Sequence, residues 1–67
     1  MNVLVNSKVQ ETNEGVSLQQ LLTQLDMAEK RGIAVAVNNA VVPGNNWSSY
    51  ELKQDDKIII IRPTQGG

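Results

Sequence analysis

Short extended apolar segments alternate along the chain with a single segment of helical periodicity. The extended segments are rich in valine, isoleucine and leucine, which favour strands, and turn-forming residues separate them. The pair Asn38-Asn39 tolerates positive φ and is a candidate for a hairpin turn. The five segments that we expect to form strands are 2–6, 9–12, 33–37, 40–42 and 57–62.

The helical segment follows a capping box, in which Ser17 and Gln20 each satisfy a free backbone N–H group of the first turn. Behind it, leucines at helical spacing form one apolar stripe. This stripe consists of Leu18, Leu21, Leu22 and Leu25. We expect the helix to end either after Asp26 or at Gly32, which can adopt the left-handed conformation behind two basic residues. The segment 47–52 is expected to be irregular or a short edge strand.

The order of elements predicts an α+β fold, in which one main helix packs on one face of a mixed sheet of four to five strands. A chain of 67 residues has room for one domain. We expect that domain to span 1–62. The remaining residues, 63–67, contain nothing that could be buried and should form a flexible C-terminal tail.

One helix covers one face of a sheet, and the strands are apolar on both faces. Alternation along the strands places Val3, Ile58 and Ile60 toward the helix and leaves other apolar residues on the opposite face. These residues are Leu4, Ala34, Ala36, Ile59 and Ile61. Strand propensity alone could account for them. Because so short a chain has nothing else to cover the patch, we interpret it as a docking surface for a partner protein.

Composition excludes several kinds of function. The chain has no cysteine and no histidine, so it lacks thiol nucleophiles and the commonest metal ligand and general base. A net charge of −1 does not favour binding to nucleic acid or to anionic membranes. Asp55 and Asp56 could suggest Mg²⁺, but adjacent carboxylates of this kind are typical of a solvated turn. Without a signal peptide or a long apolar run, we expect a soluble cytoplasmic protein.

The C-terminal pair Gly66-Gly67 carries the strongest chemical signal. Two residues without Cβ can enter a channel that is too narrow for any side chain and can present a bare α-carboxylate to a partner's active site. A carboxylate becomes an acyl donor only after activation, for example as a mixed anhydride with AMP. The chain has no phosphate-binding glycine-rich loop, so a partner must bind the ATP.

These features resemble the ubiquitin-like β-grasp sulfur carriers, and most closely the ThiS family of thiamine biosynthesis. The resemblance covers the whole chain and includes Trp47 and the acidic turn before the isoleucine-rich strand. Its most specific feature is the combination of Val35-Ala36-Val37-Asn38 with Val41-Val42-Pro43 and Trp47, whereas the β-grasp order and terminal Gly66-Gly67 are shared more widely.

The resemblance implies a protein co-substrate that is not itself an enzyme and binds no cofactor or metal. An E1-like adenylyltransferase would use Mg-ATP to adenylate Gly67. A sulfur donor such as a cysteine desulfurase would convert the adenylate to a thiocarboxylate, and thiazole synthase would accept the sulfur. Gly66, Gln65 and Thr64 would lie in the partner's channel. The small subunit of molybdopterin synthase and a β-grasp interaction module without carrier function are the alternatives.

Overall fold

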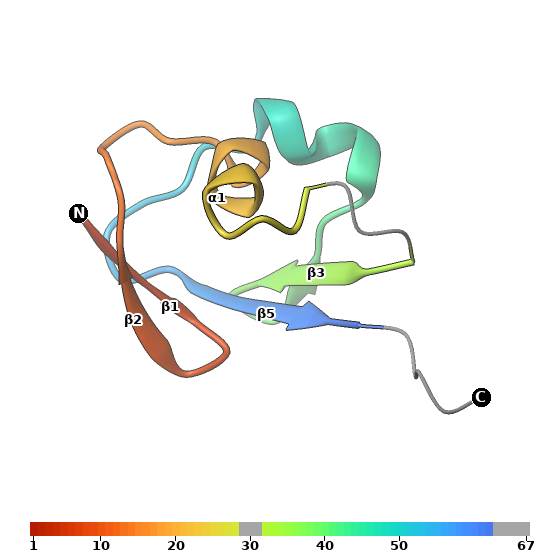
Figure 1. The fold of residues 1–67 in the computed structure, drawn as a ribbon, viewed down its shortest axis with the longest axis horizontal. Helices are drawn as coiled ribbons and strands as arrows, with labels where there is room; N and C mark the ends of the chain where they lie inside the picture. The colour runs from red at the N-terminus through yellow and green to blue at the C-terminus, as the bar shows by residue number, and fades with distance from the viewer. Residues whose placement is uncertain (29–31, 63–67) are drawn as a thin grey trace.

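The computed structural model describes residues 1–28 and 32–62, so the expected tail at 63–67 lies outside the described residues. A five-stranded mixed sheet is covered on one face by one α-helix, which confirms the expected α+β architecture (Figure 1). The elements are β1 (Asn2–Val5), β2 (Lys8–Glu11), α1 (Leu18–Gln24), β3 (Ala34–Val37), β4 (Ala40–Val41), the 3₁₀-helix η1 (Gly44–Ser49) and β5 (Lys57–Ile61).

The last strand occupies the centre of the sheet. The strand order is β2-β1-β5-β3-β4, with β5 parallel to β1 and antiparallel to β3. The Leu4 N–H donates to the Asp56 carbonyl at 2.9 Å, and the Asn6 N–H donates to the Ile58 carbonyl at 2.9 Å. Segments from the two ends of the chain are therefore paired, and β5 lies between one strand of each hairpin.

Two short turns fix the register of the hairpins. Asn6-Ser7 has φ values of 49° and 72°, and Asn38-Asn39 has φ values of 51° and 72°. Positive φ at both central residues is the requirement of the type I′ turn, whose twist matches that of the flanking strands. The turns place Leu4 opposite Val9 and Ala36 opposite Val41.

The start of α1 has the expected capping box. The Ser17 hydroxyl accepts from the Gln20 N–H at 3.1 Å, and the Gln20 side-chain oxygen accepts from the Ser17 N–H at 2.9 Å. Leu18 next donates its N–H to the Tyr50 carbonyl at 2.8 Å, which joins the helix start to the segment before β5. The cap therefore positions the helix and also connects it to a distant part of the chain.

Replacing Ser17 with alanine is expected to lower the free energy of unfolding by about 1 kcal/mol, because one helix N–H loses its acceptor. Urea unfolding of the wild-type chain and Ser17→Ala measures this change. Ser48→Ala, at an exposed position outside the cap, is the control. Equal unfolding midpoints for Ser17→Ala and wild type would contradict the proposed contribution of the cap.

The helix ends earlier than either expected position. Its last residue is Gln24, and Asp26 adopts the left-handed conformation with φ 60°. The Asp26 N–H donates to the Thr23 carbonyl at 3.0 Å, and the Met27 N–H donates to the Leu22 carbonyl at 2.7 Å, which are the two hydrogen bonds of a Schellman motif. A left-handed aspartate thus ends the helix, so the expectation of a helix continuing to Gly32 was wrong.

The segment after β4 also differs from the expectation of irregular structure or an edge strand. Residues 44–49 form the 3₁₀-helix η1, and only Glu51 makes an isolated bridge, to Ser17. Trp47 is half-buried against the core, and its indole N–H donates to the Val42 carbonyl at 2.8 Å. This tryptophan therefore holds η1 against the rest of the domain.

The core lies between α1 and the inner face of the sheet. It contains the three leucines of the helix and alternate residues of the strands, and each is less than 9% exposed. The cluster consists of Val3, Val16, Leu18, Leu21, Leu22, Val35, Val37, Val42, Leu52, Ile58 and Ile60. Leu25, the fourth leucine of the expected stripe, is half-buried and packs against this cluster.

Candidate functional site

The alternation of β5 divides its isoleucines between the core and the opposite face of the sheet. Ile58 and Ile60 are 1% and 6% exposed, whereas Ile59 and Ile61 are 44% and 57% exposed. The first pair belongs to the core cluster with the leucines of α1, and Figure 1 shows that α1 lies on one side of the sheet. We call the side of the sheet opposite α1 the outer face.

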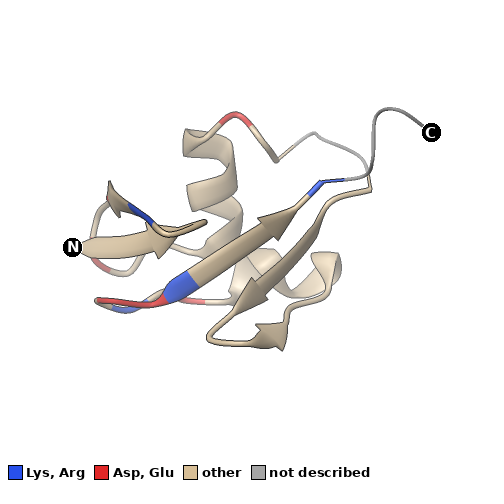
Figure 2. Ribbon diagram, turned by 90° about the horizontal axis from the view of Figure 1, so that it is seen from below, with Lys and Arg blue, Asp and Glu red and all other residues tan. Residues whose placement is uncertain are grey.

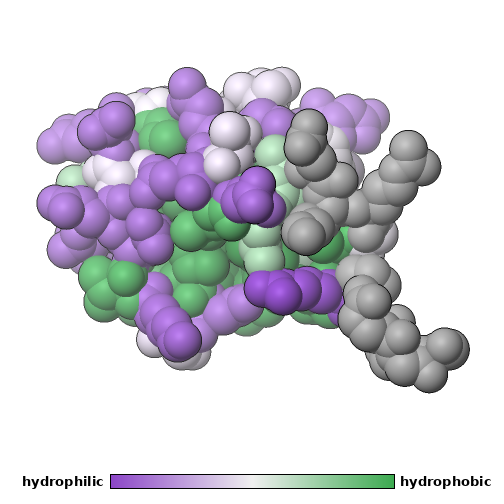
Figure 3. All heavy atoms as spheres, in the orientation of Figure 1, coloured by the Kyte–Doolittle hydropathy of each residue, from purple (hydrophilic) through white to green (hydrophobic). Residues whose placement is uncertain are grey.

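The structure brings the five residues of the expected patch together on the outer face. Ala36 is paired with Ile59 and Ala34 with Ile61, while Leu4 lies on the other side of β5. Ala34, Ile59 and Ile61 are exposed, and Leu4 and Ala36 are half-buried. Figure 3, in the orientation of Figure 1, shows one side of the molecule, where hydrophobic residues near the centre are bordered by hydrophilic ones.

Two further apolar residues belong to the outer face, although the patch expected from the sequence did not include them. Val9 is paired with Leu4 and Val41 with Ala36, so each lies on the same face as its partner, and they are 69% and 72% exposed. The signal was available, because a two-residue turn fixes which residues of its strands are opposite. With these valines the patch extends across all five strands.

The end of β5 is held by a side chain beyond the end of β1. The Asn6 side-chain oxygen accepts from the Ile60 N–H at 2.8 Å, and its amide nitrogen donates to the Ile60 carbonyl at 3.4 Å. The amide therefore replaces a backbone peptide group and continues the ladder. Arg62, the last described residue, follows β5 directly, whereas Thr64, Gln65, Gly66 and Gly67 lie outside the described residues.

Before the start of β5, the acidic turn Asp55-Asp56 connects neighbouring segments of the chain by hydrogen bonds. The Asp56 carboxylate accepts from the Asn38 side-chain amide at 2.9 Å and from the Lys53 N–H at 2.8 Å. These contacts agree with the interpretation of Asp55-Asp56 as a turn. Across residues 1–28 and 32–62, no group of three histidine, cysteine, aspartate or glutamate residues could hold a metal ion.

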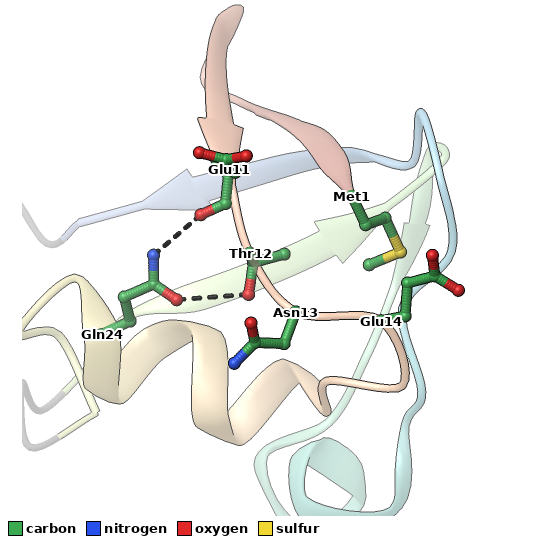
Figure 4. Close-up of a pocket in the computed structure, with 6 residues that line it drawn as sticks. All are labelled: Met1, Glu11, Thr12, Asn13, Glu14 and Gln24. Carbon is green, nitrogen blue, oxygen red and sulfur yellow. Dashed lines mark hydrogen bonds between the residues drawn. The ribbon is translucent and has the colours of Figure 1, made fainter.

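A hollow of about 480 Å³ lies at the β2 edge of the sheet, between the end of β2 and α1 (Figure 4). Gln24 crosses it, donating to the Glu11 carbonyl at 3.0 Å and accepting from the Thr12 hydroxyl at 3.2 Å. These bonds attach the last turn of α1 to the sheet and satisfy Thr12, the one buried polar residue of the described chain. The hollow is therefore part of a polar connection between α1 and the sheet.

In the described ranges, no helix has the length and apolar character needed to cross a membrane.

Comparison with known proteins gives concordant matches in sequence and structure. The model of the ThiS family matches residues 3–67. The sulfur carrier protein ThiS of Escherichia coli strain K12 is 30% identical over 67 residues, and the alignment covers both chains completely. The uncharacterized protein ycf40 of Porphyra purpurea is 31% identical and covers 100% of this chain and 93% of its own length. The crystal structure of the thiamine biosynthesis protein ThiS from Geobacter metallireducens superposes with a TM-score of 0.84 at 25% identity, with full coverage of both chains.

Proposed function

The chain belongs to the ThiS family, with the ubiquitin-like β-grasp fold, and we propose that it acts as a sulfur carrier in thiamine biosynthesis through a thiocarboxylate at Gly67. The observation that carries this proposal is the extent of the family match, which runs to residue 67 and so includes Gly66-Gly67. The alignment with the E. coli carrier likewise covers both chains to their ends.

In the proposed reaction, the chain supplies only the acyl group. A carboxylate oxygen of Gly67 attacks the α-phosphorus of ATP on an E1-like adenylyltransferase, which gives an acyl adenylate and releases pyrophosphate. Sulfur from a donor such as a cysteine desulfurase, reduced to the sulfide level by a thiol, then attacks the carbonyl carbon and displaces AMP. Thiazole synthase takes the sulfur from the resulting thiocarboxylate. The absence of cysteine fits this scheme, because the sulfur is carried on the C-terminus.

The outer face supplies the docking surface in this proposal. Its apolar patch is not covered by α1, and it includes Ile61, the last residue of β5. Arg62, the last described residue, therefore lies at the border of the patch. A partner that covers Ile59 and Ile61 would therefore lie close to Arg62. Docking would in this way bring the C-terminal residues, and the carboxylate that they carry, to the enzyme.

Formation of the thiocarboxylate provides the direct test. The purified chain is incubated with the activating enzyme of its own organism, Mg-ATP, a sulfur donor and a reducing thiol, then treated with iodoacetamide and analysed by intact mass. We expect an ATP-dependent alkylated adduct that maps to Gly67, because the chain has no cysteine to react. No adduct, with the enzyme active on a known carrier, would refute the proposal and favour the interaction module.

Introducing a charge into the patch is expected to weaken docking. Ile59→Asp should raise the Kd for the activating enzyme at least about tenfold, because a carboxylate would be desolvated against an apolar surface. Ser48→Asp adds the same charge at an exposed position on η1 and is the control. Titration calorimetry measures both, and Trp47 fluorescence checks that each variant is folded. Equal affinities for the two variants would exclude the outer face as the docking surface.

A further inference from the structure

The outer face contains one basic residue on β5, beside a hollow between β1 and β5. We propose that this hollow receives a carboxylate side chain of the activating enzyme, flanked by an apolar side chain, and that Lys57 is its ion-pair partner. The inference rests on the proposed function and identifies the chemistry by which the carrier selects its partner.

The hollow has a volume of about 300 Å³ and lies beside the pairing of β1 with β5. Their parallel pairing comprises two residue pairs, Leu4 with Lys57 and Val5 with Ile58, and the turn Asn6-Ser7 then leads the chain back into β2. The walls combine apolar and polar groups. They consist of Leu4, Ser7, Lys57, Ile58 and Ile59. A purely apolar side chain would leave the polar groups of this site without partners, whereas an acidic side chain beside an apolar one suits both.

Lys57 is fixed at the base of its side chain and directed to the outer face. Lys57 is exposed. It is paired with Leu4 and lies two residues before Ile59, so its side chain is on the same outer face as those two residues. Its N–H donates to the Asn38 side-chain oxygen at 3.0 Å, and its carbonyl accepts from the Asn38 N–H at 2.8 Å. Figure 2 shows a basic position at the start of β5 and an uncharged ribbon along the following residues of the strand.

The carboxylate next to Lys57 in the sequence is already engaged. Asp56 accepts from Asn38 and from the Lys53 N–H within the turn. An enzyme that covers Leu4 and Ile59 removes water from the neighbouring ammonium group, and a charge that is desolvated without a partner is strongly unfavourable. A carboxylate on the enzyme removes this penalty and rejects surfaces that lack one. A second copy of the chain is a poorer occupant, because a twofold contact centred here would oppose two Lys57 ammonium groups.

The experiment compares Lys57→Glu and Lys57→Gln with Lys8→Glu in the full chain. Lys8 is exposed on β2 and is paired with Val5, so its reversal gives the same net charge away from the outer face. The Kd for the activating enzyme is measured at low and high salt, and pyrophosphate release is measured at saturating carrier. We expect Lys57→Glu to raise the Kd at least about 30-fold and Lys57→Gln about fivefold. Lys8→Glu should remain within about twofold of wild type in Kd, with unchanged turnover at saturation.

The salt dependence identifies the cause of any loss. If an ion pair is formed, added salt weakens wild-type binding more than binding of Lys57→Gln. Equal affinities of Lys57→Glu and Lys8→Glu for the enzyme would overturn the inference. It would also be overturned if Lys57→Glu lost affinity only because it unfolds, while the folded Lys57→Gln bound as tightly as wild type. An increase in self-association on charge reversal, with unchanged enzyme affinity, would identify a second copy as the occupant and would also overturn it. Wild-type chain that is bound but never activated would refute the proposed function separately.

Discussion

Deleting Gly67 is expected to reduce ATP-dependent activation of the chain at least about 100-fold while its affinity for the activating enzyme changes by no more than about threefold. One residue contributes about 3.5 Å to an extended chain. A misplacement of about 1 Å at a reacting atom can already cost about 100-fold in rate. The apolar patch that we propose for docking lies on the sheet and is unchanged by the deletion, so binding and chemistry should separate.

Pyrophosphate exchange measures activation, and titration calorimetry measures binding. Gly66→Ala is the matched variant, because it keeps the length of the tail and adds only one methyl group. We expect activation of Gly66→Ala to fall as well, since a channel shaped for glycine has no space for Cβ. Full activation of the Gly67 deletion would show that activation does not require the Gly67 carboxylate, and would contradict the assignment of Gly67 as the reacting residue.

Replacing Leu21 with alanine is expected to lower the free energy of unfolding by about 2–5 kcal/mol. Leu21 is 0% exposed and lies on the face of α1 that packs on the sheet. Its truncation removes apolar contacts and leaves a cavity in a closely packed core. A single core of this size rarely supplies more than about 3–5 kcal/mol in total. The variant should therefore be largely unfolded, or close to unfolding, at room temperature.

Urea unfolding monitored by Trp47 fluorescence gives this value, because Trp47 is half-buried against the core. Val41→Ala removes two methyl groups at a position that is 72% exposed and should cost less than about 1 kcal/mol. An unfolding midpoint of Leu21→Ala that matches that of Val41→Ala would contradict the assignment of Leu21 to the core.

Local signals predicted most of the fold. The Asn38-Asn39 turn and the capping box at Ser17 each depend on residues adjacent or three apart in the chain, and both have the expected form. The helix end was not predicted, because aspartate adopts the left-handed conformation less readily than glycine and Gly32 was the stronger signal. The 3₁₀-helix depends on Trp47 reaching the Val42 carbonyl, a contact that hydrophobic periodicity does not encode.

The candidate site was predicted incompletely for a different reason. Alternation along single strands was sufficient to place Leu4, Ile59 and Ile61 on one face. It did not include Val9 and Val41, whose position follows from pairing across a turn and not from their own strands. The hollow beside Lys57 depends on the pairing of β1 with β5, two segments at opposite ends of the chain, which only the assembled sheet shows.

The sharing of β5 between core and outer face links partner binding to the stability of the whole domain. Alternate residues of one strand hold the fold together and, in the proposed function, contact the enzyme, so only the folded chain presents the binding surface. By mass action, an enzyme present at 100 times its Kd adds about 2.7 kcal/mol to the unfolding free energy. That gain is of the same order as the cost of truncating a core leucine, so the docked carrier should resist heat and proteolysis far better than the free one.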